Sequence, residues 1–128
     1  MKRIAFMMAA LLAACVSEAP EPTDPGTGDV TIEMTSNLTF APAAAQARVG
    51  QTVVWVNVSS MPHTVTADPD LAGNPASVSL PVGAAPFASP LVSAGGSFSH
   101  TFTVPGTYRY FCQPHEGAGM IGTIVVVP

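Results

Sequence analysis

The chain has 128 residues, of which 9% are charged and 48% are hydrophobic. This length suits one domain, and the composition is typical of a compact globular chain rather than a disordered one. Eight acidic residues outnumber four basic ones, for a formal net charge of −4. Because no basic footprint is present, we expect no binding to nucleic acid.

The N-terminus has the pattern of a targeting segment. Lys2 and Arg3 precede an apolar run, Ile4 to Ala14, which is too short to span a bilayer as a helix. The run ends in Leu-Ala-Ala-Cys15, which resembles the lipobox of bacterial lipoproteins, in which the cysteine is acylated and becomes the first mature residue. The resemblance implies a lipoprotein signal peptide over residues 1–14 and lipid attachment at Cys15.

An ordinary secretory signal cut near the same place is the alternative to a lipoprotein signal. Either signal exports the domain. With acylation, we expect a protein anchored to a membrane at the cell envelope and facing the periplasm or the exterior. A disulfide between Cys15 and Cys112 is also open, since exported proteins favour such bonds, whereas acylation of Cys15 leaves Cys112 alone.

Residues 15–29 are expected to form the acylated cysteine and a linker. Val16 to Asp29 contains three prolines and four acidic residues but almost nothing to bury. Its prolines favour extended backbone, so the linker would hold the following domain away from the membrane surface.

The remaining segment, 30–128, is predicted to be a single all-β domain. Runs rich in β-branched and aromatic residues alternate with turn residues, and no window keeps a helical period. Ala41 to Ala47 is expected to be an irregular or edge strand, and 67–96 to be mostly loop. The predicted strands are Val30–Met34, Thr52–Val58, Phe98–Thr103, Tyr108–Cys112 and Gly122–Val127, which is typical of a β-sandwich.

The segment Tyr-Arg-Tyr-Phe-Cys-Gln-Pro-His-Glu-Gly-Ala-Gly-Met-Ile-Gly, residues 108–122, carries the chemistry. Within nine residues it places a thiol (Cys112), an imidazole (His115) and a thioether (Met120). Strand alternation sends Cys112 to the core face and Phe111 to the opposite one. Two histidines, a thiolate and a weak methionine make a blue-copper ligand set, so one more histidine is expected, and Pro62-His63 after the Trp55 strand supplies it.

Together, the spacing Cys-x2-His-x4-Met and the upstream Pro-His closely resemble plastocyanin and its bacterial relatives among the cupredoxins. The resemblance covers about Val30 to Pro128. It implies a cupredoxin-like Greek-key β-sandwich with one type 1 copper ion. It also implies three equatorial ligands, His63, Cys112 and His115, and Met120 as the axial one.

This resemblance further implies a carrier that exchanges single electrons with other redox proteins through Cu(I) and Cu(II). The chain departs from plastocyanin at Thr64, where asparagine is usual and helps to join the ligand loops; a hydroxyl can take over part of that role. Phe111 replaces a surface tyrosine of plant plastocyanins. The acidic patch is reduced to Asp68 and Asp70, so photosynthetic partners do not follow.

We expect a monomer that docks transiently with redox partners near His115, whose neighbours Gly117 to Gly119 are small.

The alternative function is an extracytoplasmic copper chaperone or buffer, although only Met34, Met61 and Met120 follow the signal segment. An enzyme is not expected, because one short domain lacks the second domain and the extra histidines of copper nitrite reductases. His100 is expected to be a hydrogen-bonded structural histidine.

Overall fold

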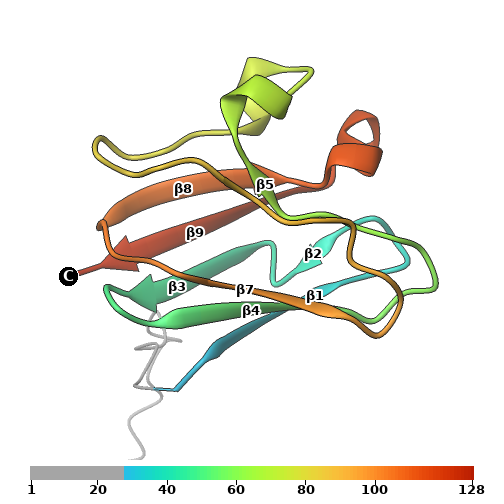
Figure 1. The fold of residues 1–128 in the computed structure, drawn as a ribbon, viewed down its shortest axis with the longest axis horizontal. Helices are drawn as coiled ribbons and strands as arrows, with labels where there is room; N and C mark the ends of the chain where they lie inside the picture. Colours follow the sequence, from blue (N-terminus) through green and yellow to red (C-terminus); the bar gives the residue numbers. More distant parts are fainter. Residues whose placement is uncertain (1–27) are drawn as a thin grey trace, which may run out of the picture.

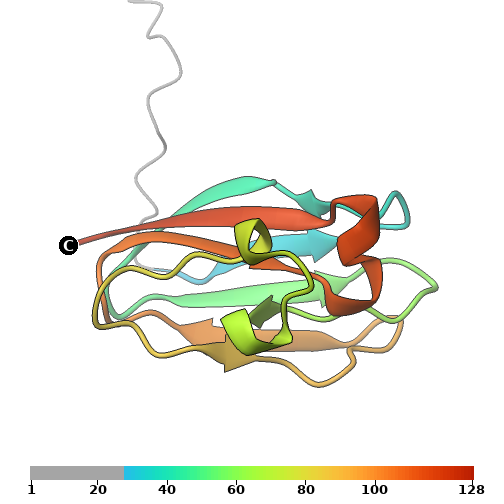
Figure 2. The ribbon, with the colours of Figure 1, turned by 90° about the horizontal axis from the view of Figure 1, so that it is seen from above.

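The computed structural model describes residues 28–128; the expected signal peptide, Cys15 and nearly all of the linker lie outside the described residues. The described chain forms two facing β-sheets with short 3₁₀ helices in the loops (Figures 1 and 2). Within this range no helix has the length and apolar character to cross a membrane. The elements are β1 (Val30–Met34), β2 (Phe40–Ala41), β3 (Ala44–Arg48), β4 (Thr52–Asn57), β5 (Thr66–Ala67), η1 (Pro69–Leu71), η2 (Pro75–Ser77), β6 (Phe87–Ala88), β7 (Ser97–Thr101), β8 (Gly106–Phe111), η3 (Gln113–Ala118) and β9 (Ile121–Val127).

Both sheets are mixed. The first has the strand order β2-β1-β4-β7 and the second the order β3-β9-β8-β5-β6. β1 runs parallel to β4 and β3 runs parallel to β9, whereas the other neighbours are antiparallel. The prediction of a single all-β domain is confirmed, and the first strand starts at the expected Val30.

The chain passes from one sheet to the other through several short connections, among them those between β2 and β3 and between β7 and β8. After β2 the chain passes a cis peptide bond at Ala41-Pro42 and enters the second sheet as β3, an edge strand as expected. Between β7 and β8 it turns at Gly106, whose φ of 137° favours glycine. Tyr108 Oη donates to the Val104 carbonyl across this turn, at 2.6 Å. These crossings place the ends of β4 and β8 at the same end of the sandwich (Figure 1).

The core between the sheets is aromatic. β4 alternates partly exposed and buried residues, which sends Val53, Trp55 and Asn57 inward. Trp55 and Tyr110 meet edge to face at a centroid distance of 5.4 Å, and Phe40 contacts Tyr110 at 4.6 Å. Burial of such large apolar side chains stabilises the fold by roughly 1.5–3 kcal/mol each. This core makes the ends of β4 and β8 a rigid base for the loops that follow them.

The outer face of β8 is not exposed along its whole length. Arg109 is exposed and Tyr110 and Cys112 are buried, in keeping with strand alternation, but Phe111 is buried as well. Beyond β5 the chain runs beside β8 again, where Ser79 pairs with Arg109 through two backbone hydrogen bonds of 2.8 and 3.1 Å. Alternation therefore assigns Phe111 to a face of the sheet but does not show whether that face is covered.

Residues 67–96 are mainly loop, as expected, with η1, η2 and the two-residue strand β6. His100 lies on β7, and its ring stacks on Phe87 of β6 at a centroid distance of 3.9 Å. Burial lowers the pKa of His100. Its role is structural, as expected, although the recorded contact is an aromatic stack rather than a hydrogen bond.

Candidate metal centre

Three predicted ligand residues meet at the end of the sandwich where β4 and β8 finish. His63 comes from the loop after β4, and Cys112 and His115 come from the connection between β8 and β9, which contains η3. Cys112 Sγ lies 3.6 Å from His63 Nδ1 and 3.5 Å from His115 Nδ1. The three candidate ligand atoms all lie within 4.8 Å of one another. Residues 49 positions apart in sequence thus present their donor atoms to one point.

Met120 is also buried at this end and is joined to the two other loop ligands through the backbone. Its carbonyl accepts from Cys112 N at 3.0 Å, and its N–H donates to the His115 carbonyl at 3.3 Å. The His115 N–H in turn donates to the Cys112 carbonyl at 3.2 Å. These bonds close the turn upon itself, but the position of the Met120 sulfur as a fourth ligand stays a prediction.

The chemistry of the donor set fits copper. Two imidazole nitrogens and a thiolate, with a thioether nearby, form the ligand combination of blue-copper sites. Burial raises the pKa of the Cys112 thiol, while hydrogen bonds from Thr64 act against this rise. One of these is the Thr64 N–H, which points at Cys112 Sγ from 3.3 Å. These donors therefore offset only part of the cost of placing negative charge on a desolvated sulfur.

His63 is held in place at its backbone and at its ring. Its backbone pairs with Val92 through two hydrogen bonds of 2.8 and 3.1 Å, and the side chain is fully buried. Nε2 lies 2.9 Å from Ser59 Oγ, which leaves Nδ1 facing Cys112. Burial is the main cause that lowers the pKa of His63; the nearby His115 lowers it further, and a hydrogen bond with the Thr35 carbonyl raises it. A partner on Nε2 selects the tautomer whose Nδ1 is free to bind metal.

Asn57, at the end of β4, organises the loop that carries His63. Its Nδ2 donates to the carbonyls of Met61 at 2.7 Å and of Val92 at 2.9 Å. Its Oδ1 accepts from the N–H and the hydroxyl of Ser59, at 3.0 and 2.7 Å. Because Asn57 is 1% exposed, these bonds form in a water-excluded environment, where they specify one loop conformation.

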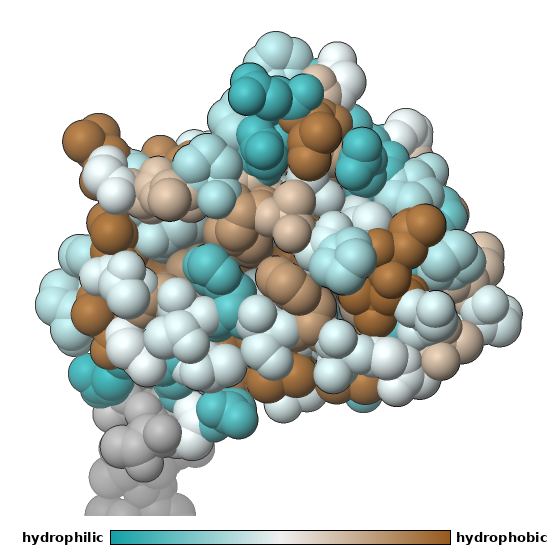
Figure 3. Space-filling model, in the orientation of Figure 1, coloured by the Kyte–Doolittle hydropathy of each residue, from teal (hydrophilic) through white to brown (hydrophobic). Residues whose placement is uncertain are grey.

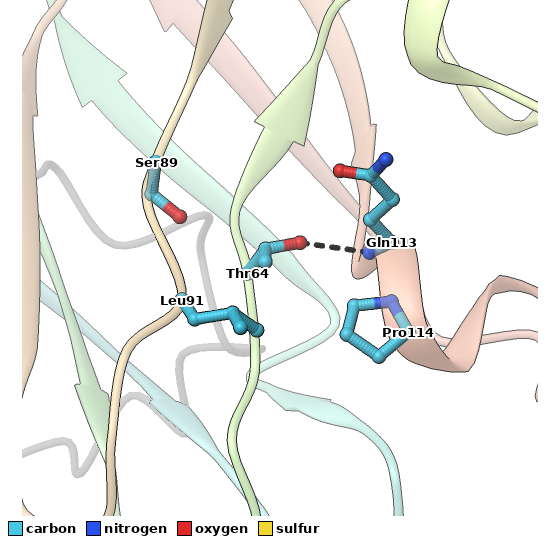
Figure 4. A pocket seen from close by; sticks show the side chains of 5 residues that line it. All are labelled: Thr64, Ser89, Leu91, Gln113 and Pro114. Carbon is cyan, nitrogen blue, oxygen red and sulfur yellow. Dashed lines mark hydrogen bonds between the residues drawn. The ribbon is translucent and has the colours of Figure 1, made fainter.

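Thr64 joins the two ligand loops. Its Oγ1 accepts from Gln113 N at 2.8 Å, across 49 positions of sequence, and shares a second bond of 2.9 Å with Thr66 Oγ1. Figure 4 shows the bond to Gln113 beside Pro114, at an open cleft of about 400 Å³. The hydroxyl therefore does connect the loops at the position where the resemblance leads one to expect asparagine.

The other side of the centre is held differently. His115 is half-buried, and Glu116 directly after it reaches the loop between β5 and β6. The Glu116 carboxylate accepts from Gly73 N at 3.0 Å, Asn74 N at 2.8 Å and Ser77 Oγ at 2.9 Å. The two backbone donors chiefly account for the lowered pKa of Glu116.

Sequence reasoning missed Asn57, Ser59 and Glu116. Asn57 did carry a signal, since it is a polar residue at an inward-facing position of an apolar strand, and such residues are usually hydrogen-bonded. Ser59 and Glu116 carried none, because their partners are set by how loops fold back rather than by periodicity.

Comparison with known proteins agrees with this geometry. Residues 27–127 match the family described as copper binding proteins, plastocyanin/azurin family. Plastocyanin of Scenedesmus fuscus is 39% identical over 101 residues, which cover 77% of this chain and 99% of that protein. Plastocyanin of Nostoc punctiforme is 38% identical over 92 residues, which cover 70% of this chain and 65% of the relative. The match spans only 52–59% of four chloroplastic plastocyanins, at 35–37% identity.

Solved structures of amicyanin show the same fold. A methionine variant in its Cu(I) form superposes with a TM-score of 0.61 at 29% identity, covering 81% of this chain and 87% of that one. A proline variant in its oxidized state gives a TM-score of 0.61 at 30% identity, covering 78% and 83%.

The fold and the donor atoms together define a small copper protein of the cupredoxin class. The chain belongs to the plastocyanin/azurin family of copper-binding proteins. It is therefore a carrier of single electrons that uses one copper ion, and not an enzyme.

Proposed function

We propose that this chain passes single electrons between redox proteins at the cell envelope, with one copper ion bound by His63, Cys112, His115 and Met120. The observation that supports the ligand assignment most directly is the convergence of three donor atoms within 4.8 Å. Bound copper supplies the one-electron redox couple. The protein contributes the ligands and a fixed geometry, because an electron moves fast only when little has to rearrange.

His63, Cys112 and Met120 are buried, and His115 is the ligand residue nearest to solvent. His115 is therefore the exit that this proposal assigns to electrons. The surface on this side contains Leu91, which is 62% exposed, and Pro114. Hydrophobic residues gather on the right of the face in Figure 3, the end at which η3 lies in Figure 1. A small apolar surface favours brief docking with a redox partner.

We also propose that the protein works tethered to a membrane and outside the cytoplasm. The support is sequence alone: a lipobox-like Leu-Ala-Ala-Cys15 and a proline-rich linker that ends where β1 begins. The tether would limit the search for partners to a shell near the membrane while leaving the copper end accessible. Mass spectrometry of the membrane fraction, with Cys15→Ser as the control, tests the acyl group.

The copper assignment is tested by anaerobic titration of the purified full-length chain with Cu(II). We expect an intense blue absorption band that saturates at about one copper per chain, because thiolate-to-copper charge transfer requires the Cys112 sulfur. Cys112→Ser removes that sulfur at nearly constant size and should abolish the band.

A colourless product at saturation contradicts the ligand assignment. Fast copper release to an acceptor protein, with slow electron exchange, would instead favour copper delivery as the function. His100→Gln is a matched control, since it removes a histidine on β7 away from the three clustered ligands and should leave the band unchanged.

A further inference from the structure

The two imidazole ligands differ in what holds them. His63 has a side-chain partner on Nε2 and a backbone pair with Val92. For the His115 ring, the hydrogen-bonding contact recorded among the described residues is with Cys112 Sγ. Its position therefore depends on the backbone of the turn, which includes Gly117 and Gly119. Glycines leave a backbone more freedom than other residues do, so this half of the site needs an external restraint.

Glu116 provides that restraint. Its carboxylate receives three hydrogen bonds from the 73–77 segment, more than 38 positions away in sequence. Gly73 N–H reaches Oε2, whereas Asn74 N–H and the Ser77 hydroxyl both reach Oε1. Charge-assisted bonds of this kind are stronger than bonds between neutral groups.

The 73–77 segment is itself attached to the scaffold. Two residues beyond it, Ser79 pairs with Arg109 of β8 through two backbone hydrogen bonds. Ser77 is 3% exposed, so the donor to Glu116 belongs to a packed part of the loop. An open cleft of about 620 Å³ otherwise separates this segment from η3, and the Glu116 side chain lies along it. Figure 2 shows η1, η2 and η3 as neighbouring coils on one side of the sandwich.

We propose that Glu116 is a positioning residue for electron transfer: by fastening the copper-binding turn to the 73–77 segment, it keeps His115 in one place in both redox states. The proposal rests on the assigned role of His115 as a ligand and electron exit. It predicts that loss of these bonds slows electron exchange without removing the copper site.

Two variants separate the bonds from the charge. Glu116→Ala removes the carboxylate and all three bonds. Glu116→Gln removes the same charge, but its amide oxygen can still accept from Asn74 N–H and Ser77 Oγ, while its NH₂ group cannot accept from Gly73 N–H. Glu33→Gln, on the exposed side of β1 in the other sheet, changes net charge by the same amount and serves as the control.

Amide hydrogen exchange, NMR order parameters in the diamagnetic Cu(I) form, and the electron self-exchange rate are measured on full-length protein. In Glu116→Ala we expect the Asn74 amide to exchange about tenfold faster, since a lost hydrogen bond corresponds to roughly that factor. The amides of residues 115–118 should become more mobile, and self-exchange should slow severalfold. Glu116→Gln should lie closer to the wild type, and Glu33→Gln should match it.

If Glu116→Ala shows the same loop order and the same self-exchange rate as Glu116→Gln and Glu33→Gln, the proposal is wrong. A failure of the copper assignment is distinguishable from this result, because it appears as a missing blue band in the wild type. The amide exchange of Asn74 in the metal-free protein would still report whether Glu116 fastens the two segments.

Discussion

The two halves of the metal centre are built in opposite ways. The His63 half is embedded in the protein: Asn57 and Ser59 bond to the loop and to the ring, and all three residues are at least 93% buried. The His115 half is a self-closed turn at the surface, connected to the body by the side chains of Thr64 and Glu116. The comparison teaches that one ligand is positioned by burial and the other by a few long-range hydrogen bonds. The site thereby combines rigidity with an exposed edge.

The largest loss of stability is expected at Asn57, whose side chain bonds to several groups of the buried half. Asn57→Ala removes two donors and an acceptor, which leaves the Met61 and Val92 carbonyls without these partners in a buried region. The Met61 carbonyl keeps the Ser59 hydroxyl as a donor and the Val92 carbonyl keeps the His63 N–H, so each lost bond costs about 0.5–1.5 kcal/mol. Because the two bonds from Ser59 to Asn57 Oδ1 are lost as well, the free energy of unfolding should fall by roughly 2–5 kcal/mol. Chemical denaturation of the metal-free protein measures it. Val58→Ala, at a neighbouring side chain that is 54% exposed, is the control and should change little; equal effects of the two substitutions would contradict the distinction between the halves.

A smaller loss of stability is expected at Thr64, whose hydroxyl joins the two halves. Thr64→Val keeps the shape of the side chain but removes the hydroxyl that accepts from Gln113 N. We expect a loss of about 1 kcal/mol in unfolding free energy and faster hydrogen exchange at the Gln113 amide. Thr64→Ser retains the hydroxyl and should keep that amide protected. If valine protects the Gln113 amide as well as serine does, the hydroxyl does not join the loops.

The smallest effect is a change in how stability depends on pH, and it concerns His100, which lies outside both halves of the metal centre. Because burial lowers the pKa of His100, the unfolded chain binds more protons than the folded one once the pH falls below the ordinary histidine value of about 6.5. Stability is therefore fully present above that value and declines as the pH falls toward the folded pKa. The ring packs against Phe87 and Phe102, and Tyr108 shares its pocket.

His100→Phe keeps the aromatic stack and removes the titrating group. We expect its thermal midpoint to fall less between pH 7.5 and pH 5 than that of the wild type, in measurements on the metal-free protein. His63 titrates in both proteins, so only the difference between them reports on His100. Parallel pH profiles would show that His100 contributes nothing to acid sensitivity.

The sequence was sufficient for the main strands and for the two segments that carry the clustered ligands. Strand alternation correctly placed Cys112 in the core, since neighbours along a strand alternate whatever lies around them. It could not show that Phe111 is buried, because alternation assigns a side chain to a face and does not say what covers that face. Nor could the contacts of Ser59 and Glu116 be predicted: they depend on how irregular segments meet in space.

The arrangement of the ligands along the chain has a consequence for biogenesis. Cys112, His115 and Met120 lie within nine residues, whereas His63 is 49 positions from Cys112 and reaches it only when the sandwich closes. A newly made, unfolded chain therefore already presents three of its four proposed donors on one short stretch. Any affinity of that stretch for copper reduces the stabilisation that the metal gives to the folded state. It also allows metal capture to precede folding, so that His63 completes the coordination as the last step of maturation.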